Sequence, residues 1–165
     1  MTAAAACAPH VPWSRSDAQG IITRLRDQPG ALMPILTELV RRFGYIDPDI
    51  IPELAEALNL SRAEVHGVIS FYHDFRTTPP GRHILRICRA ESCQAVGGRA
   101  LEQHARQQLG VDWHQTTDDG RFTLEPVYCL GNCACSPALM VDETLFGRVT
   151  SERFDEITAM AEWNP

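Results

Sequence analysis

Five of the six cysteines in this chain fall into two short segments, and thiols at such spacing can bind metal or do redox chemistry. The first segment, CRAESC, holds Cys88 and Cys93 with four residues between them. The second, VYCLGNCAC at residues 127–135, holds Cys129, Cys133 and Cys135. This grouping raises four possibilities: a disulfide framework, a zinc site, a redox-active thiol pair, or part of a cofactor site.

The spacing within each pair favours an iron–sulfur cluster but leaves other readings open. Zinc knuckles usually have two residues between their cysteines, because a narrow turn grips one small ion. A two-iron cluster is larger, so wider loops suit it, with one iron held by each pair. The sequence has no C-x-x-C motif, which argues against thioredoxin-type disulfide exchange. Structural zinc and buried or redox thiols remain the alternatives.

The other cysteines fit the paired pattern less well. Cys135 lies two residues after Cys133 and could replace it as a ligand. The chain must turn there toward SPALMV, so we predict a buried residue that binds no metal. Cys7, in an alanine-rich stretch, is predicted to be a surface thiol. Gly131 lies between Cys129 and Cys133, where a positive φ would bring backbone N–H groups close to sulfur.

Histidines can replace thiolates as iron ligands, so their positions matter. We expect packing or surface roles for the following histidines, none of which lies in a cysteine segment: His66, His73, His83, His104 and His114. The sequence therefore favours ligation by cysteine alone. Arg86 and Arg89 flank Cys88, where their charge could offset that of an anionic cluster, although a solvated surface explains them equally well.

The first half of the chain is predicted to be helical, and the elements that must position the cysteines follow it. The stretch GALMPILTELVRRFG has apolar residues three and four apart, with Pro34 in its first turn and Gly44 as its stop. Similar spacing predicts three further helices, near residues 21–25, 51–58 and 61–75. A capping box of Ser61 and Glu64 opens the last of them. Four helices that each bury one face predict a small bundle.

Three aromatic residues near the end of the fourth predicted helix allow two interpretations: Phe71, Tyr72 and Phe75. Their spacing continues the apolar face of that helix, which favours a place in the bundle core. The alternative is a docking surface for a partner protein.

The second half of the chain changes character after RTTPPGR, residues 76–82, which we interpret as a linker. Predicted strands lie at residues 83–90, 122–129, 138–143 and 146–150, the last as the return of a hairpin, and predicted helices lie at 97–109 and 151–163. Each cysteine pair directly follows a strand. Two loops at one edge of one sheet could then present four thiolates to a common centre.

Composition narrows the class of protein. A chain of 165 residues can bury a core without disulfides. Its 21 acidic and 15 basic residues give a net charge of −6, which argues against nucleic acid as a partner. A redox-sensing DNA-binding protein is disfavoured too, because the candidate recognition helix 61–75 lacks a basic face. With no signal peptide or membrane span evident, we expect a soluble cytoplasmic protein without direct membrane insertion, whose thiols stay reduced.

The order C-x4-C, a gap of 35 residues and C-x3-C in YCLGNC, preceded by GVISFYHDF, resembles the thioredoxin-like [2Fe-2S] ferredoxin family. That family includes the 24 kDa-type subunit of NADH dehydrogenase, the corresponding subunits of NAD-linked hydrogenases and the gamma subunit of NAD-dependent formate dehydrogenase. The resemblance extends from about Gly30 to Trp163. It implies one [2Fe-2S] cluster with four ligands, Cys88, Cys93, Cys129 and Cys133. Cys135 is not among the family's ligand positions.

The resemblance also implies an α+β fold, with an N-terminal helical bundle followed by a thioredoxin-like α/β [2Fe-2S] domain. We expect four regions in the chain: a flexible tail at 1–16, the bundle at 17–76, a linker at 77–82 and the ferredoxin domain at 83–165.

Within the family, HGVISFYHDF and CRAESCQA look most like the formate dehydrogenase gamma subunit. The expected function is one-electron transfer in a soluble NAD-dependent formate dehydrogenase. The expected partners are a flavoprotein that binds FMN and NAD, and a large molybdenum- or tungsten-containing subunit. The corresponding subunit of NADH:quinone oxidoreductase or of an NAD-reducing hydrogenase is the alternative, and a zinc-stabilised interaction module is the second. Since the chain lacks a dinucleotide fingerprint and a P-loop, we expect an enzyme component that is not catalytic alone.

Overall fold

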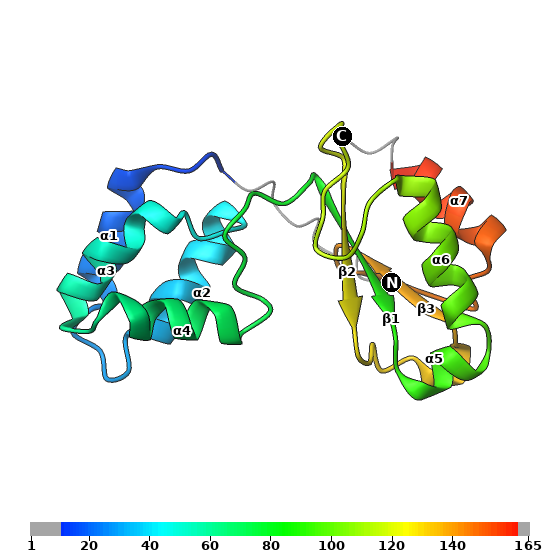
Figure 1. Cartoon of the computed structure of the whole chain (residues 1–165), viewed down its shortest axis with the longest axis horizontal. Coiled ribbons are helices and arrows are strands. Elements are labelled where there is room, and N and C mark those ends of the chain that lie inside the picture. The colour runs from blue at the N-terminus through cyan, green and yellow to red at the C-terminus, as the bar shows by residue number, and fades with distance from the viewer. Residues whose placement is uncertain (1–10, 162–165) are drawn as a thin grey trace, which may run out of the picture. The chain divides into compact units, whose positions relative to one another are not determined.

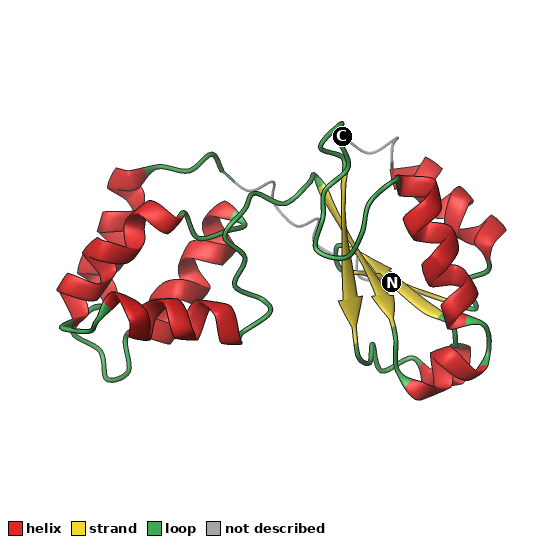
Figure 2. Cartoon of the chain, viewed as in Figure 1, coloured by secondary structure: helices red, strands yellow, loops and turns green. Residues whose placement is uncertain are grey.

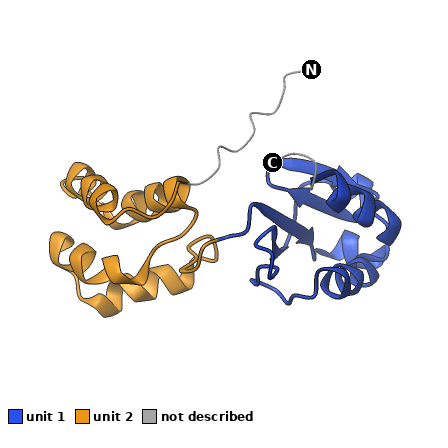
Figure 3. Cartoon of the chain, turned by 90° about the horizontal axis from the view of Figure 1, so that it is seen from above, with its two compact units in different colours: residues 1–8, 80–165 blue, residues 9–79 orange. Residues whose placement is uncertain are grey.

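The computed structural model describes residues 11–161. The described residues divide into two compact units, one spanning residues 11–79 and the other residues 80–161 (Figure 3). The first unit is made of helices, and the second combines a sheet with helices (Figure 2). This arrangement confirms the predicted α+β class, with a helical bundle ahead of an α/β domain.

The described part of the helical unit consists of α1 (Arg15–Leu25), α2 (Leu32–Phe43), the short 3-10 helix η1 (Pro48–Ile50), α3 (Ile51–Leu58) and α4 (Arg62–Phe71) (Figure 1). The four predicted helices are all present. α2 ends at Gly44, whose φ of 80° is left-handed. Ser61 and Glu64 form the predicted capping box at the start of α4.

These helices share one apolar core. Leu36, Leu39 and Leu54 have no exposed surface. Trp13, just ahead of α1, packs on Phe43 with 4.7 Å between the ring centroids. Burying a leucine or phenylalanine side chain stabilises the fold by about 1.5–3 kcal/mol. Since isolated helices this short are marginal in water, the shared core is what holds them.

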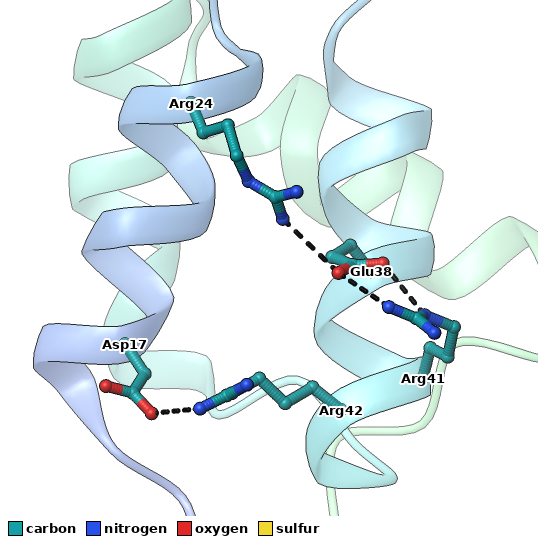
Figure 4. Close-up of polar contacts among 5 residues, drawn as sticks. All are labelled: Asp17, Arg24, Glu38, Arg41 and Arg42. Carbon is teal, nitrogen blue, oxygen red and sulfur yellow. Dashed lines mark hydrogen bonds and ion pairs between the residues drawn. The ribbon is translucent and has the colours of Figure 1, made fainter.

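Ion pairs join α1 to α2 on the surface of this unit (Figure 4). Glu38 of α2 accepts hydrogen bonds from Arg24 of α1 at 3.2 Å and from Arg41 at 2.9 Å. Arg42 pairs with Asp17 at 2.5 Å. The hydrogen bond from Arg41 is the main cause that holds the pKa of Glu38 below its usual range. Because the arginines are exposed to solvent, these pairs contribute little to the stability of the fold.

The aromatic residues at the end of α4 depart from the prediction. The helix ends at Phe71, and Tyr72 already has extended backbone, with φ −91° and ψ 113°. Phe71 is 72% exposed and Tyr72 is 43% exposed, so their predicted place in the bundle core is wrong. Phe75 packs partly against that core. For Tyr72 the spacing misled because it continues a helical face past Phe71, the residue where the helix stops.

The α/β unit contains β1 (His83–Cys88), α5 (Glu91–Ala95), α6 (Gly98–Leu109), β2 (Phe122–Val127), η2 (Cys133–Cys135), β3 (Ala138–Val141), β4 (Thr144–Gly147) and α7 (Ser151–Ala161). Its four-stranded sheet has the order β2-β1-β3-β4. β1 runs parallel to β2 and antiparallel to β3, and β3 and β4 form an antiparallel hairpin.

The strands β1, β2 and β3 each end two residues before their predicted ends, and β4 ends at Gly147 rather than at residue 150. Two further details differ from the predicted elements. The short helix α5 lies where a loop is predicted, because five residues are too few to show a helical period. β4 begins at Thr144 rather than at residue 146, since Asp142 and Glu143 alone make the turn from Val141. Asp142 has a φ of 53°, the left-handed backbone that a two-residue hairpin turn requires.

α6 and α7 lie side by side and pack against the sheet (Figure 1). Their core joins Leu85, Leu124 and Leu139 of the strands to Leu101 of α6 and Phe154 of α7. This core fixes β1 and β2, the two strands that lead to the cysteines. Within residues 11–161, no helix is both long enough and apolar enough to cross a membrane.

Candidate metal centre

β1 and β2 carry the two cysteine pairs to the same edge of the sheet. The strands are parallel and in register, with Cys88 opposite Val127. Their arrowheads lie at the same end, beside α5 (Figure 1). The backbone N–H of Arg89 extends the pairing beyond β1 by donating to the carbonyl of Val127 at 2.7 Å. Cys88 ends β1 and Cys129 follows β2 by two residues, so the parallel pairing brings both segments together.

The first pair is enclosed by protein. Cys88 is 3% exposed and Cys93 is 1% exposed, and the neighbouring Cys93 thiol contributes to raising the pKa of Cys88. Cys93 lies on α5 rather than in the predicted loop. Burial is the main cause that raises the pKa of the Cys88 thiol, while backbone N–H groups of Ala90 and Leu130 donate to its sulfur and oppose that rise.

The second pair faces outward. Cys129 and Cys133 are exposed, and the hydrogen bond between their thiols is the main cause that raises the pKa of Cys133. Gly131 has the predicted positive φ, 73°, and its backbone N–H donates to the sulfur of Cys129 at 3.3 Å. The backbone N–H of Leu130, from the same segment, also helps to lower the pKa of the Cys88 thiol, so this segment influences sulfurs of both pairs.

Two serines tie the segments to each other. Ser92 of α5 donates to the carbonyl of Cys133 at 3.1 Å. The hydroxyl of Ser136 lies 2.9 Å from the same carbonyl, 2.9 Å from the Ser92 hydroxyl and 3.5 Å from the sulfur of Cys93. Sequence reasoning missed both residues, since a serine has no ligand spacing of its own. Their adjacency to Cys93 and Cys135 was the one signal that could have found them.

Two glycines give the cysteine segments room. A Cβ on Gly98, at the start of α6, would lie 2.6 Å from the carbonyl oxygen of Cys93. A Cβ on Gly147 of β4 would lie 2.7 Å from the Cβ of Cys135, which is itself half-buried. Such approaches exclude a larger residue without a backbone shift. Cys7 lies outside the described residues.

The donor set fits a two-iron cluster. The sulfurs fall into two neighbouring pairs, Cys88 with Cys93 and Cys129 with Cys133, and within each pair one thiol contributes to raising the pKa of the other. In the described part of the chain, no three Cys, His, Asp or Glu side chains gather closely enough to hold a single metal ion. Two pairs side by side match a cluster in which each iron takes two thiolates. Nearby N–H donors suit the negative charge of such a group.

The charged residues near the first pair are engaged with other protein groups. Arg89 pairs with Glu102 at 3.0 Å and its guanidinium stacks over Trp113, 5.2 Å from the ring centroid. Arg86 donates to the carbonyl of Asp142 at 2.9 Å. Each arginine therefore makes a structural contact within the protein. Neither of the two predicted roles, offsetting the cluster charge or lying on a solvated surface, included such a contact.

Three histidines of the α/β unit pair with carboxylates: His83 with Asp142 at 2.8 Å, His104 with Asp155 at 2.7 Å and His114 with Glu125 at 2.5 Å. These contacts agree with the packing and surface roles expected for them.

Comparison with known proteins gives one family and several relatives. The family model described as thioredoxin-like [2Fe-2S] ferredoxin matches residues 18–162. The chain is 37% identical over 135 residues to a subunit of the NADH-quinone oxidoreductase of Pseudomonas aeruginosa, covering 82% of this chain and 81% of the relative. It is 31% identical over 138 residues to the HndA subunit of the NADP-reducing hydrogenase of Solidesulfovibrio fructosivorans, covering 84% and 81%.

A solved structure is also similar. In the crystal structure of an NAD+-reducing [NiFe]-hydrogenase in the air-oxidised state, one chain is 26% identical, with a TM-score of 0.62. The match covers 86% of the present chain but only 24% of the hydrogenase chain, so most of that larger chain has no counterpart here.

Proposed function

The chain belongs to the thioredoxin-like [2Fe-2S] ferredoxin family, and we propose that it is the one-electron carrier subunit of an NAD(P)H-linked oxidoreductase complex. Its cofactor is one [2Fe-2S] cluster, as the family implies. When bound, such a cluster takes up or releases a single electron, whereas nicotinamide cofactors exchange two electrons as a hydride. The remaining chemistry of the complex therefore belongs to partner subunits.

The proposed ligands are Cys88, Cys93, Cys129 and Cys133. The single observation that carries this assignment is the parallel register of β1 and β2, with Cys88 opposite Val127, which brings both pairs to one sheet edge. Metal ligation requires thiolates, so loading the site releases the thiol protons. The N–H groups of Ala90, Leu130 and Gly131 would then face anionic sulfur, which favours the bound state.

The site is also divided by exposure in a way that suits electron transfer. Cys88 and Cys93 are buried, which anchors one side of the site in the protein. Cys129 and Cys133 are exposed, as is Tyr128, whose side chain is 70% exposed. The exposed side would present the cluster to a partner. We propose that the electron enters or leaves through the Cys129–Cys133 segment.

The proposed partner is a flavoprotein that binds FMN and NAD(H). The names of the relatives support a nicotinamide-linked complex, since they are subunits of an NADH-quinone oxidoreductase and an NADP-reducing hydrogenase. These relatives support the alternative expected from the sequence better than they support formate dehydrogenase. Formate stays a substrate to test because of the likeness of HGVISFYHDF and CRAESCQA to the gamma subunit. We also propose a cytoplasmic location, where thiols stay reduced.

Reconstitution with the flavoprotein partner tests this proposal. The isolated chain, loaded anaerobically, should accept an electron from dithionite but not from NADH. With the flavoprotein added, NADH should bleach the visible bands of the cluster. If NADH still fails to reduce the cluster in a complex whose flavin it does reduce, the proposed role is wrong. Co-purified subunits would show whether the complex acts on quinone, hydrogen or formate.

A further inference from the structure

The hydroxyl of Ser136 lies where the two cysteine segments meet. Three polar atoms surround it: the carbonyl oxygen of Cys133 at 2.9 Å, the hydroxyl of Ser92 at 2.9 Å and the sulfur of Cys93 at 3.5 Å. The residue is half-buried. A hydroxyl has one proton to donate, so it cannot donate to every one of these neighbours at once.

With Cys93 as a thiol, the hydrogen bonds have a clear order. The thiol of Cys93 donates to the Ser136 oxygen, and Ser136 donates to the carbonyl of Cys133. A Cys93 that binds iron has lost its proton, so its sulfur can only accept. The contact at 3.5 Å must then reverse direction or be lost.

Ser92 makes the reversal possible. Its hydroxyl already reaches the carbonyl of Cys133 at 3.1 Å, so that acceptor keeps a donor when Ser136 turns away. Two hydroxyl protons then serve two acceptors, the Cys133 carbonyl and the Cys93 sulfur. Each acceptor then keeps a hydroxyl donor, which matters most for the Cys93 sulfur because Cys93 is 1% exposed.

We propose that Ser136 is a positioning residue that donates a hydrogen bond to the Cys93 thiolate and thereby raises the reduction potential of the cluster. The proposal rests on the proposed ligand role of Cys93. Reduction adds negative charge to the cluster, and a donor to a ligand sulfur stabilises that charge more in the reduced state than in the oxidised state. Ser92 supports this bond by holding the Cys133 carbonyl.

A potentiometric titration of the loaded protein, followed by electron paramagnetic resonance, tests the proposal. Ser136→Ala should keep the cluster and lower its potential, and Ser136→Thr, which retains the hydroxyl, should stay close to the wild type. Ser70→Ala is the matched control, because Ser70 also donates to a backbone carbonyl, that of Gly67 at 3.1 Å, but in the helical unit. A potential unchanged by Ser136→Ala, or lowered equally by Ser70→Ala, would overturn the proposal.

Ser92→Ala gives a second and independent test. Without Ser92, Ser136 is the hydroxyl left at the Cys133 carbonyl, 2.9 Å away, and we expect it to donate there. The potential should then fall although Ser92 donates to no sulfur. The Ser92→Ala/Ser136→Ala double variant should then match Ser136→Ala alone, since both changes remove the same bond. Additive shifts would contradict the exchange of donors. If the Ser136→Ala variant cannot hold a cluster, the reduction potential of the Ser92→Ala variant tests the proposal instead. A Ser92→Ala potential equal to that of the wild type would reject the proposal.

The ligand assignment is tested separately with Cys93→Ser. A Cys93→Ser variant that retains a wild-type cluster would refute the proposed ligand set itself. A cluster lost in Cys93→Ser, together with an unchanged potential in Ser136→Ala, would refute the role of Ser136 alone.

Discussion

The backbone N–H of Gly131 donates to the sulfur of Cys129 at 3.3 Å, and Gly131 does so from a left-handed φ of 73°. A side chain disfavours this backbone by roughly 1–2 kcal/mol, while space is not the obstacle, because no atom lies within 4 Å of a Cβ built there. The segment between Cys129 and Cys133 therefore depends on glycine for its conformation. This dependence can be tested by substitution.

Gly131→Ala should lower the free energy of unfolding of the α/β unit by about 1 kcal/mol and shorten the lifetime of the cluster in air. Gly120→Ala is the matched control, since Gly120 has a φ of 69° and equally open surroundings in the same unit. It should cost similar stability in urea unfolding and leave the cluster lifetime unchanged. Equal loss of the cluster in both variants would show that strain alone, rather than the Gly131 contact, is responsible.

The proposed ligands predict a specific pattern of cysteine variants. Serine at any of four positions should strongly reduce iron bound per chain: Cys88, Cys93, Cys129 and Cys133. Cys135→Ser and Cys7→Ser should retain the cluster. Iron analysis and visible absorption after anaerobic reconstitution would measure this. Loss of the cluster in Cys135→Ser with retention in Cys133→Ser would place the fourth ligand at Cys135 instead.

The aromatic residues at the end of α4 predict a contrast in stability. Phe71 is 72% exposed, so Phe71→Ala should change the free energy of unfolding by less than about 0.5 kcal/mol. Phe43 is 2% exposed in the core of the same unit, so Phe43→Ala should lower the free energy of unfolding by about 3–5 kcal/mol. Chemical denaturation followed by circular dichroism would compare them. A large loss of unfolding free energy in Phe71→Ala would show that the Phe71 side chain is packed in the core.

The buried Cys88 thiol predicts a pH dependence in the metal-free, reduced protein. Burial, as the main cause, raises the pKa of this thiol above its value in an unfolded chain, which is about 8.5. A group with a raised folded-state pKa stabilises the fold below the unfolded value, and that contribution is lost as pH rises through the folded value. Stability should therefore fall above about pH 8.5.

Urea unfolding of the metal-free protein between neutral and alkaline pH would measure this fall. Cys88→Ala removes the titrating group, so its stability should fall less steeply over the same range. Identical slopes for the wild type and Cys88→Ala would show that another group causes the pH dependence.

The sequence contained most of the fold and the outline of the site. Apolar spacing predicted the four helices of the first unit, because each buries one face, and the cap residues Gly44 and Ser61 marked two ends. Alternation predicted the strands that lead to each cysteine pair. The places where the prediction failed are short or local, such as α5, the turn at Asp142 and the end of α4 at Phe71.

What the sequence could not supply depends on contacts between distant segments. The bonds of Ser136 to Cys93 and of Ser92 to Cys133 join residues more than forty positions apart. The need for glycine at position 98 appears only when the carbonyl of Cys93 is in place. The partners of Arg86 and Arg89 likewise come from a β-turn and from α6. No periodicity or motif records such contacts.

The most direct test of the central claim is the metal and sulfide content of the wild-type chain purified without air, read together with its electron paramagnetic resonance spectrum. We predict a red-brown protein with two irons and two acid-labile sulfides per chain, which is silent when oxidised and shows the signal of a single [2Fe-2S] centre after one-electron reduction. A colourless, folded protein with stoichiometric zinc and no labile sulfide would contradict it.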